Sequence, residues 1–84
     1  MHRATPRFWE CFGQLPDSAQ QIVRRNFRLL VDNPGHPSLW LKKVSKFWSV
    51  RVGLDYRALA VDDGGDFIWV WIGSHNEYDR LIGT

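Results

Sequence analysis

The residues of this chain that could do chemistry are a few cations, an imidazole and a carboxylate near the ends of apolar segments. His75 follows such a segment and precedes a predicted helix start, so its side chain would be held in place yet exposed. Arg51 lies on the polar side of an apolar segment, and Asp55 and Arg57 bracket Tyr56 beside a turn. An imidazole can transfer a proton near neutral pH, and a guanidinium can neutralise an anion. Each residue also has a purely structural interpretation, as a turn His, a turn carboxylate or a solvated Arg.

Positive charge is concentrated in the first three quarters of the chain. Residues 1–61 carry ten of the eleven Lys and Arg against four acids, a net charge of +6, whereas residues 62–84 carry a net charge of −4. A basic body attracts polyanions. Lys42, Lys43 and Lys46 could hold phosphates or protect an edge strand from aggregation. Most of the Trp residues are expected in the core, although one or two could stack on bases.

Several classes of site are absent from the sequence. It has no Gly-rich phosphate loop and no nucleophile elbow. Its three His residues lack Cys or Glu at ligand spacing, so we expect neither a metal nor another cofactor. The single Cys11 excludes an internal disulfide and suits a core position in a reducing compartment. No apolar run is long enough for a membrane span and the N-terminus has no signal-peptide pattern, which predicts a cytoplasmic protein.

Apolar periodicity predicts a helical hairpin over residues 5–32. Thr5 followed by Pro6 is typical of a helix start. Asp17, with a Gln three residues later, matches a capping box at the start of a second helix. Asn33-Pro34-Gly35 would end that helix.

The apolar period then changes to two, which predicts strands. The four expected strands are Leu39 to Val44, Phe47 to Val52, Tyr56 to Val61 and Phe67 to Ile72. The gaps between them are too short for parallel crossovers, so consecutive strands should be antiparallel. Ser74 and Glu77 repeat the capping-box spacing and predict a short final helix. The whole chain is expected to form one α+β domain, residues 1–84, with one sheet face open to a ligand.

Four segments resemble the RelE/ParE superfamily of bacterial toxins. They are Asn33-Pro-Gly-His-Pro-Ser-Leu39, Lys42-Lys43, Trp48-Ser-Val-Arg-Val-Gly-Leu-Asp-Tyr-Arg57 and Trp71-Ile-Gly-Ser-His-Asn-Glu-Tyr-Asp79. The order of helices and strands is similar as well. The resemblance implies a RelE/ParE-like fold, in which an N-terminal helical hairpin packs on a curved antiparallel sheet of about four strands with a short C-terminal helix. Residues 1–4 could supply the short first strand that these toxins usually have.

Within the superfamily, the YafQ-like ribonucleases share three short elements with this chain. Their His-Pro-Leu, Asp-Trp and Gly-Thr-His elements are similar to His36-Pro37-Ser38-Leu39, Asp55-Tyr56 and Gly73-Ser74-His75. By this resemblance His36, Asp55 and His75 would be catalytic. A second His of the pattern falls at Arg51, a departure that would change which group acts as the base.

The Tyr-Arg pair of RelE itself is similar to Tyr56-Arg57, and the aromatic residue of the last helix in both RelE and the YafQ-like group is similar to Tyr78. RNA cleaves itself when its 2′-OH is deprotonated and attacks the adjacent phosphate, so the protein must supply a base, an acid and positive charge. In this hypothesis His75 protonates the leaving 5′-oxygen and Asp55 orients a His or acts as the base. The guanidinium groups of Arg51 and Arg57 neutralise the phosphorane, and Tyr78 stacks on or orients a base. Phosphates would be engaged by Lys42, Lys43 and Lys46.

The resemblance therefore implies the toxin of a type II toxin–antitoxin system. Such toxins cut mRNA in the A site of the ribosomal 30S subunit without a metal, and a cognate antitoxin silences them. One alternative is a ParE-like toxin that inhibits DNA gyrase through a protein interface, and another is an inactive interaction module of the same fold. The joint presence of His36, Asp55 and His75 favours the ribonuclease, because a pure binding protein needs no such set.

Overall fold

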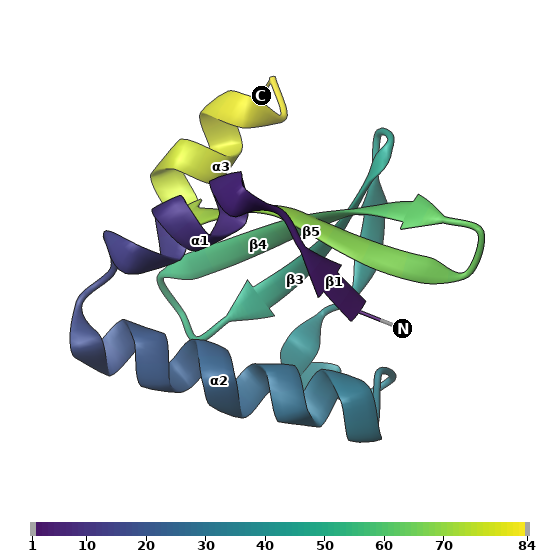
Figure 1. Cartoon of the computed structure of the whole chain (residues 1–84), viewed down its shortest axis with the longest axis horizontal. Coiled ribbons are helices and arrows are strands. Elements are labelled where there is room, and N and C mark those ends of the chain that lie inside the picture. Colours follow the sequence, from purple (N-terminus) through teal and green to yellow (C-terminus); the bar gives the residue numbers. More distant parts are fainter. Residues whose placement is uncertain (1, 84) are drawn as a thin grey trace.

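A five-stranded mixed sheet forms the centre of the computed structural model, which describes residues 2–83 (Figure 1). The strands are β1 (His2–Ala4), β2 (Lys42–Val44), β3 (Phe47–Val52), β4 (Tyr56–Asp63) and β5 (Asp66–Ser74). Their order across the sheet is β1-β5-β4-β3-β2. The pairs β2–β3, β3–β4 and β4–β5 are antiparallel as predicted, whereas β1 pairs parallel with β5.

The sheet has one strand more than the apolar pattern predicted. This strand is β1, and it confirms the expectation from the resemblance that residues 1–4 supply a short first strand. It is too short to show a period and pairs with a segment more than sixty residues away, with His2 opposite Phe67. The start of β2 does differ from the prediction, because it lies at Lys42 and not at Leu39. A 3₁₀ helix, η1 (Pro37–Leu39), occupies the preceding residues and brings Leu39 into the core.

The helices are α1 (Pro6–Gly13), α2 (Asp17–Asp32) and α3 (His75–Leu81). The Thr5 side chain accepts a hydrogen bond from the Phe8 N–H at 3.2 Å, and this confirms the predicted start of α1. The capping box predicted at Asp17 is wrong, because Pro16 occupies the cap position without a side-chain bond. The Gln20 amide instead donates to the carbonyls of Phe12 and Leu15, which ties α2 back to the end of α1.

The main core lies between the sheet and the helices α1 and α2, and α2 runs along one face of the sheet (Figure 1). Its buried residues are Phe8, Phe12, Leu30, Leu39, Val50, Val52, Ala58, Ala60, Trp69 and Ile72. A second, smaller cluster of Leu59, Trp71 and Tyr78 lies on the opposite face, under α3. None of the described helices is both long and apolar enough to span a bilayer.

A β-bulge allows β5 to serve both clusters. Ala60 pairs with Trp69 and Leu59 pairs with Trp71, so Val70 is the extra residue on β5. Trp69 and Ile72 can therefore both join the main core, while Trp71 points to the second cluster. Gly73 is required beyond the bulge, because a Cβ at this position would overlap the Trp71 indole. This packing places the end of β5, and with it the start of α3, against the open face of the sheet.

Candidate functional site

The sheet face opposite α2 carries a cavity of about 270 Å³. Its floor comes from β3 and β4, one wall from α3, and the other wall from the segment that enters β2. The lining residues are Trp40, Lys42, Val44, Ser49, Arg51, Arg57, His75, Tyr78, Asp79 and Ile82. Three of them are Lys or Arg and one is acidic, so we refer to this cavity as the cationic hollow.

Two arginines form the charged floor of the cationic hollow. Arg51 on β3 and Arg57 on β4 are directly opposed in the strand register. Arg57 Nη1 donates to the Tyr56 carbonyl at 2.8 Å, and Arg51 Nε donates to the Gly53 carbonyl at 3.3 Å. Like charges that face each other across a strand pair repel and destabilise the sheet. A bound anion would relieve that repulsion, which makes the pair suited to holding a phosphate.

His75 and Tyr78 stand on the α3 wall. The predicted capping box is confirmed there, since the Glu77 N–H donates to Ser74 Oγ at 3.2 Å and the Ser74 N–H donates to Glu77 Oε1 at 3.1 Å. It fixes His75 at the first position of α3, with its Nε2 3.6 Å from Asp79 Oδ1. The imidazole stacks beside the Tyr78 ring at a centroid distance of 6.4 Å.

Trp40 forms part of the opposite wall, and the sequence did not single it out from the other Trp residues. Its backbone is left-handed, with φ of 48°, and 60% of its surface is exposed. The Arg51 guanidinium carbon lies 5.4 Å from the centre of its ring. A left-handed backbone costs a bulky residue on the order of 1–3 kcal/mol. The available sequence signal was the order Leu39-Trp40-Leu41, because both leucines pack in the core and Trp40 between them points away.

The remaining predicted residues do not line the cationic hollow. His36 caps η1, where its Nδ1 accepts the Ser38 N–H at 3.2 Å and lies 2.8 Å from Ser38 Oγ. Asp55 is exposed on the β3–β4 turn, and its backbone carbonyl accepts the His75 N–H at 2.8 Å. Lys43 and Lys46 are exposed and do not line the cavity. Five of the nine predicted residues thus line one cavity: Lys42, Arg51, Arg57, His75 and Tyr78.

If His36, Asp55 and His75 were catalytic together, as the resemblance implies, they would have to converge on one site, and in this structure they do so only in part. His75 lines the cationic hollow, and a backbone hydrogen bond holds the turn of Asp55 beside it. His36 does not line the cationic hollow, and its side chain caps the start of η1 instead. Across residues 2–83, no three His, Cys, Asp or Glu side chains are grouped closely enough to hold a metal ion.

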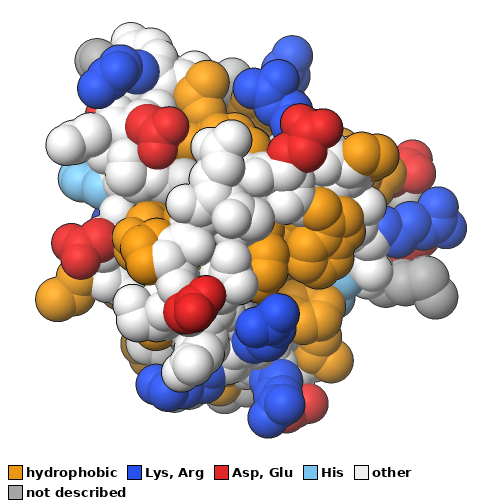
Figure 2. Space-filling view, turned by 60° about the vertical axis from the view of Figure 1, so that its left-hand side comes forward, with side chains coloured by type: hydrophobic (Ala, Val, Ile, Leu, Met, Phe, Trp, Pro, Cys, Tyr) orange, Lys and Arg blue, Asp and Glu red, His pale blue; other side chains and the backbone are white. Residues whose placement is uncertain are grey.

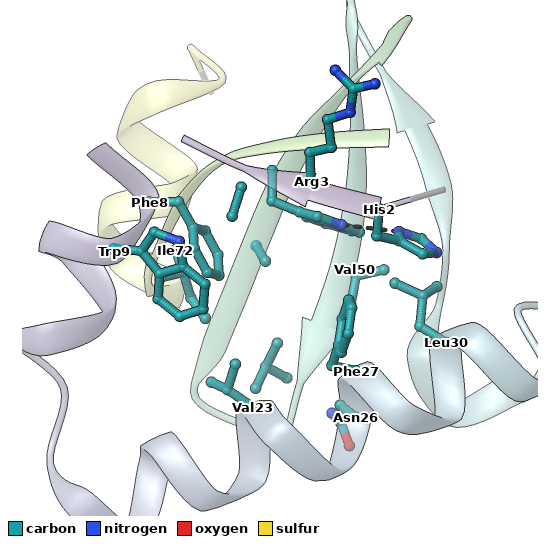
Figure 3. Close-up of a pocket in the computed structure, with 14 residues that line it drawn as sticks. His2, Arg3, Phe8, Trp9, Val23, Asn26, Phe27, Leu30, Val50 and Ile72 are labelled. Carbon is teal, nitrogen blue, oxygen red and sulfur yellow. Dashed lines mark hydrogen bonds between the residues drawn. The ribbon is translucent and has the colours of Figure 1, made fainter. Parts of the chain in front are cut away.

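A second cavity, of about 190 Å³, lies between α1, α2 and β1 and is lined almost entirely by apolar side chains (Figure 3). His2 lies at one side of it, where its Nδ1 accepts a hydrogen bond from Trp69 Nε1 at 3.1 Å. Burial lowers the pKa of His2 from its ordinary value of 6.5, although the nearby Asp66 carboxylate raises it. The residues that line this cavity include one cation, Arg3, and so form no cluster of positive charge. The surface around α1 and α3 shows apolar side chains mixed with side chains of both charges (Figure 2). The cationic hollow is therefore the candidate site for an anionic ligand.

Comparison with known proteins assigns the fold to a family. A family model described as the ParE-like toxin domain matches residues 38–80, more than half of the chain. No curated protein sequence matches the chain.

Solved structures extend the likeness to nearly the whole chain. A chain of the RelB-RelE antitoxin–toxin complex from Methanococcus jannaschii superposes with a TM-score of 0.74 at 13% identity, covering 94% of this chain and 96% of that one. YafQ from E. coli gives a TM-score of 0.69 at 10% identity, covering 93% and 96%. A YoeB/ParE toxin from Agrobacterium tumefaciens gives 0.65 at 14% identity, covering 88% and 96%. At these identities the structures show a shared fold, and together with the family match they establish that the chain belongs to the ParE-like toxin domains of the RelE/ParE superfamily.

Proposed function

We propose that this protein is a metal-independent endoribonuclease that cuts mRNA in the A site of the ribosomal 30S subunit, in the cytoplasm, as the toxin of a type II toxin–antitoxin system. The observation that carries the proposal is the grouping of two opposed arginines with His75 and Tyr78 in one cavity. A protein that acts only as a binding surface has no need of an imidazole in the same cavity as two paired guanidinium groups.

The proposed reaction begins when the 2′-OH of the RNA loses its proton and attacks the adjacent phosphorus. The phosphorane that forms carries extra negative charge, which Arg51 and Arg57 neutralise from the floor of the cationic hollow. The bond to the 5′-oxygen then breaks, and His75 donates a proton to that oxygen. Asp79, at 3.6 Å from His75 Nε2, holds the protonated imidazole in place. The products are a 2′,3′-cyclic phosphate and a free 5′-OH.

The remaining assigned roles follow the resemblance to ribonucleases of this fold. Asp55 is proposed as the base, since a hydrogen bond from the His75 N–H keeps its turn beside the acid. His36 is proposed as a second imidazole, which would have to release its bond to Ser38 to reach the RNA. Tyr78 orients a base from the α3 wall. Phosphates outside the reacting one are held by Lys42, Lys43 and Lys46.

Expression in a bacterium tests the proposal when the ends of cellular transcripts are mapped. We expect growth arrest with cuts inside translated codons, and His75→Ala should abolish both. Asn76→Ala is the matched control, because Asn76 is the exposed neighbour on the same turn of α3. Arrest that persists in a folded His75→Ala variant would refute the assigned role.

A cognate antitoxin is the proposed protein partner. The RelB-RelE complex of the same fold pairs a toxin with its antitoxin. An acidic or amphipathic segment would be complementary to the three cations of the cationic hollow and would block RNA. Gel filtration with the product of the neighbouring gene should show a complex, and Arg51→Glu with Arg57→Glu should weaken it. If the antitoxin still copurifies with the variant that carries both charge reversals, it binds a surface other than the cationic hollow.

Inhibition of DNA gyrase is the alternative function, and the ParE-like description of the matching family favours it. In that case growth arrest would come with DNA-damage signals and intact messages. His75→Ala would then leave toxicity unchanged, because no proton transfer takes part.

A further inference from the structure

We propose that Trp40, backed by Arg51, is a stacking platform for a nucleobase next to the cleaved phosphate, so that the substrate is bound as a single strand. The inference rests on the proposed ribonuclease function and adds to it a recognition residue that the reaction itself does not require.

Trp40 is exposed and its backbone is strained, two features that do not stabilise the fold. With 60% of its surface exposed it differs from Trp69 and Trp71, which keep 5% and 7%. It also has a left-handed backbone, a conformation that side chains larger than Gly rarely adopt. Exposure of a large aromatic ring and a strained backbone both act against stability, and such features gather at functional sites.

The ring is nevertheless held in a defined position. Leu39 is fully buried and Leu41 packs against the same core, so the backbone is anchored on both sides of Trp40. Arg51 lies over the indole at 5.4 Å, and its Nε bond to the Gly53 carbonyl fixes the guanidinium in turn. A ring that is fixed before binding loses little conformational entropy when a base stacks on it.

The surroundings favour a nucleic acid over an apolar protein segment as the occupant. Trp40 lines the same cavity as Lys42, Arg51 and Arg57. Aromatic rings interleaved with cations are the arrangement that binds single strands, since bases stack on the rings while the cations follow the phosphates. An apolar partner would instead have to desolvate three cations without compensation.

Strand spacing gives the scale of the site. Trp40 precedes β2 on one wall and Tyr78 stands on α3 at the other, with β3 and β4 between them. Neighbouring strands are about 4.8 Å apart, so β2 and β5, which carry the two walls, are separated by three spacings, on the order of 14 Å. A phosphate on the arginine floor would have one base beside Trp40 and another directed toward the α3 wall, where His75 is exposed and Tyr78 is mostly buried. Bases can be splayed in this way only in a single strand.

The first test uses a short single-stranded RNA that carries the fluorescent base 2-aminopurine and 2′-deoxy sugars that prevent cleavage. Stacking on the indole should quench the fluorescence, and Trp40→Ala should remove the quenching and weaken binding by about 5- to 150-fold, the usual range for the loss of one stacked base. Trp40→Phe should retain most of both effects. Trp9→Ala is the matched control, because Trp9 is similarly exposed, at 56%, but does not line the cationic hollow.

The second test measures cleavage of mRNA on programmed ribosomes, and it does not depend on the affinity of the protein for free RNA. A similar loss of cleavage rate is expected for Trp40→Ala, with rescue by Trp40→Phe. Equal activity of Trp40→Ala and the parent in both assays would overturn the inference. So would a Trp40→Ala variant that loses only antitoxin binding, which would identify Trp40 as a protein contact.

The two proposals fail separately. Quenching without any cleavage by the parent protein would remove the ribonuclease function and leave the stacking platform. Cleavage that depends on His75 but not on Trp40 would leave the ribonuclease and remove the platform.

Discussion

Repulsion between Arg51 and Arg57 can be measured directly, because the two residues are opposed in the strand register. The perturbation is a double-mutant cycle of Arg51→Gln, Arg57→Gln and the two together. Each single change also removes a hydrogen bond to a backbone carbonyl. The cycle cancels these separate losses and leaves the interaction between the two side chains.

The magnitude follows from the geometry of the strand pair. Cβ atoms of directly opposed residues are about 5 Å apart, and at that separation two unit charges repel by about 0.8 kcal/mol in bulk water and about 3 kcal/mol at an effective dielectric constant of 20. Both side chains are only half-buried and can splay apart, so we expect the low end, about 0.2–1 kcal/mol. Arg57→Gln should be less destabilising by this amount when Arg51 is present than in the Arg51→Gln background.

Urea unfolding of the antitoxin-free protein provides the assay, at about 0.01 M and again at about 1 M salt, where the screening length falls from about 30 Å to about 3 Å. The coupling should shrink at high salt. A parallel cycle of Arg51→Gln with Arg28→Gln, an exposed residue of α2, should show none. A coupling energy of zero, or an attractive one, at low salt would refute the conclusion that Arg51 and Arg57 repel each other and that a bound anion would relieve this repulsion.

Three further predictions concern the fold. Burial lowers the pKa of His2 below its unfolded value of 6.5, so the unfolded chain binds a proton more readily than the folded one. The free energy of unfolding should therefore fall as pH drops below about 6.5. In the His2→Phe variant, the free energy of unfolding should change less with pH across that range. Leu39→Ala should cost about 2–5 kcal/mol in urea unfolding because Leu39 is fully buried, whereas Leu54→Ala, at 76% exposure, should change stability by less than about 0.5 kcal/mol. Gly73→Ala should destabilise by about 1–3 kcal/mol, because its Cβ would overlap the Trp71 indole, whereas Gly13→Ala meets open space and should be neutral or stabilising in thermal unfolding. Equal effects within either matched pair would contradict the packing described for β5 or for η1.

Local patterns in the sequence determined most of the elements. Thr5-Pro6 and the Ser74–Glu77 box begin helices where they were predicted, because capping bonds join residues only three positions apart. Gly64 and Gly65 form the turn between paired Asp63 and Asp66, and both adopt a positive φ, which glycine permits without strain. Period-two alternation assigned Arg51 to the polar face of β3, where it now lines the cationic hollow.

Tertiary packing decided what no local pattern carries. The strand β1 exists because β5 offers it an edge, and Asp17 does not form its predicted capping box because Gln20 reaches the end of α1. Trp40 is exposed because the leucines on either side of it are drawn into the core. His36 does not line the hollow, and its ring is hydrogen-bonded within η1 to Ser38. Such outcomes depend on contacts between distant segments and on competition for hydrogen bonds, so a sequence can supply the chemical groups while only the folded chain determines which of them meet.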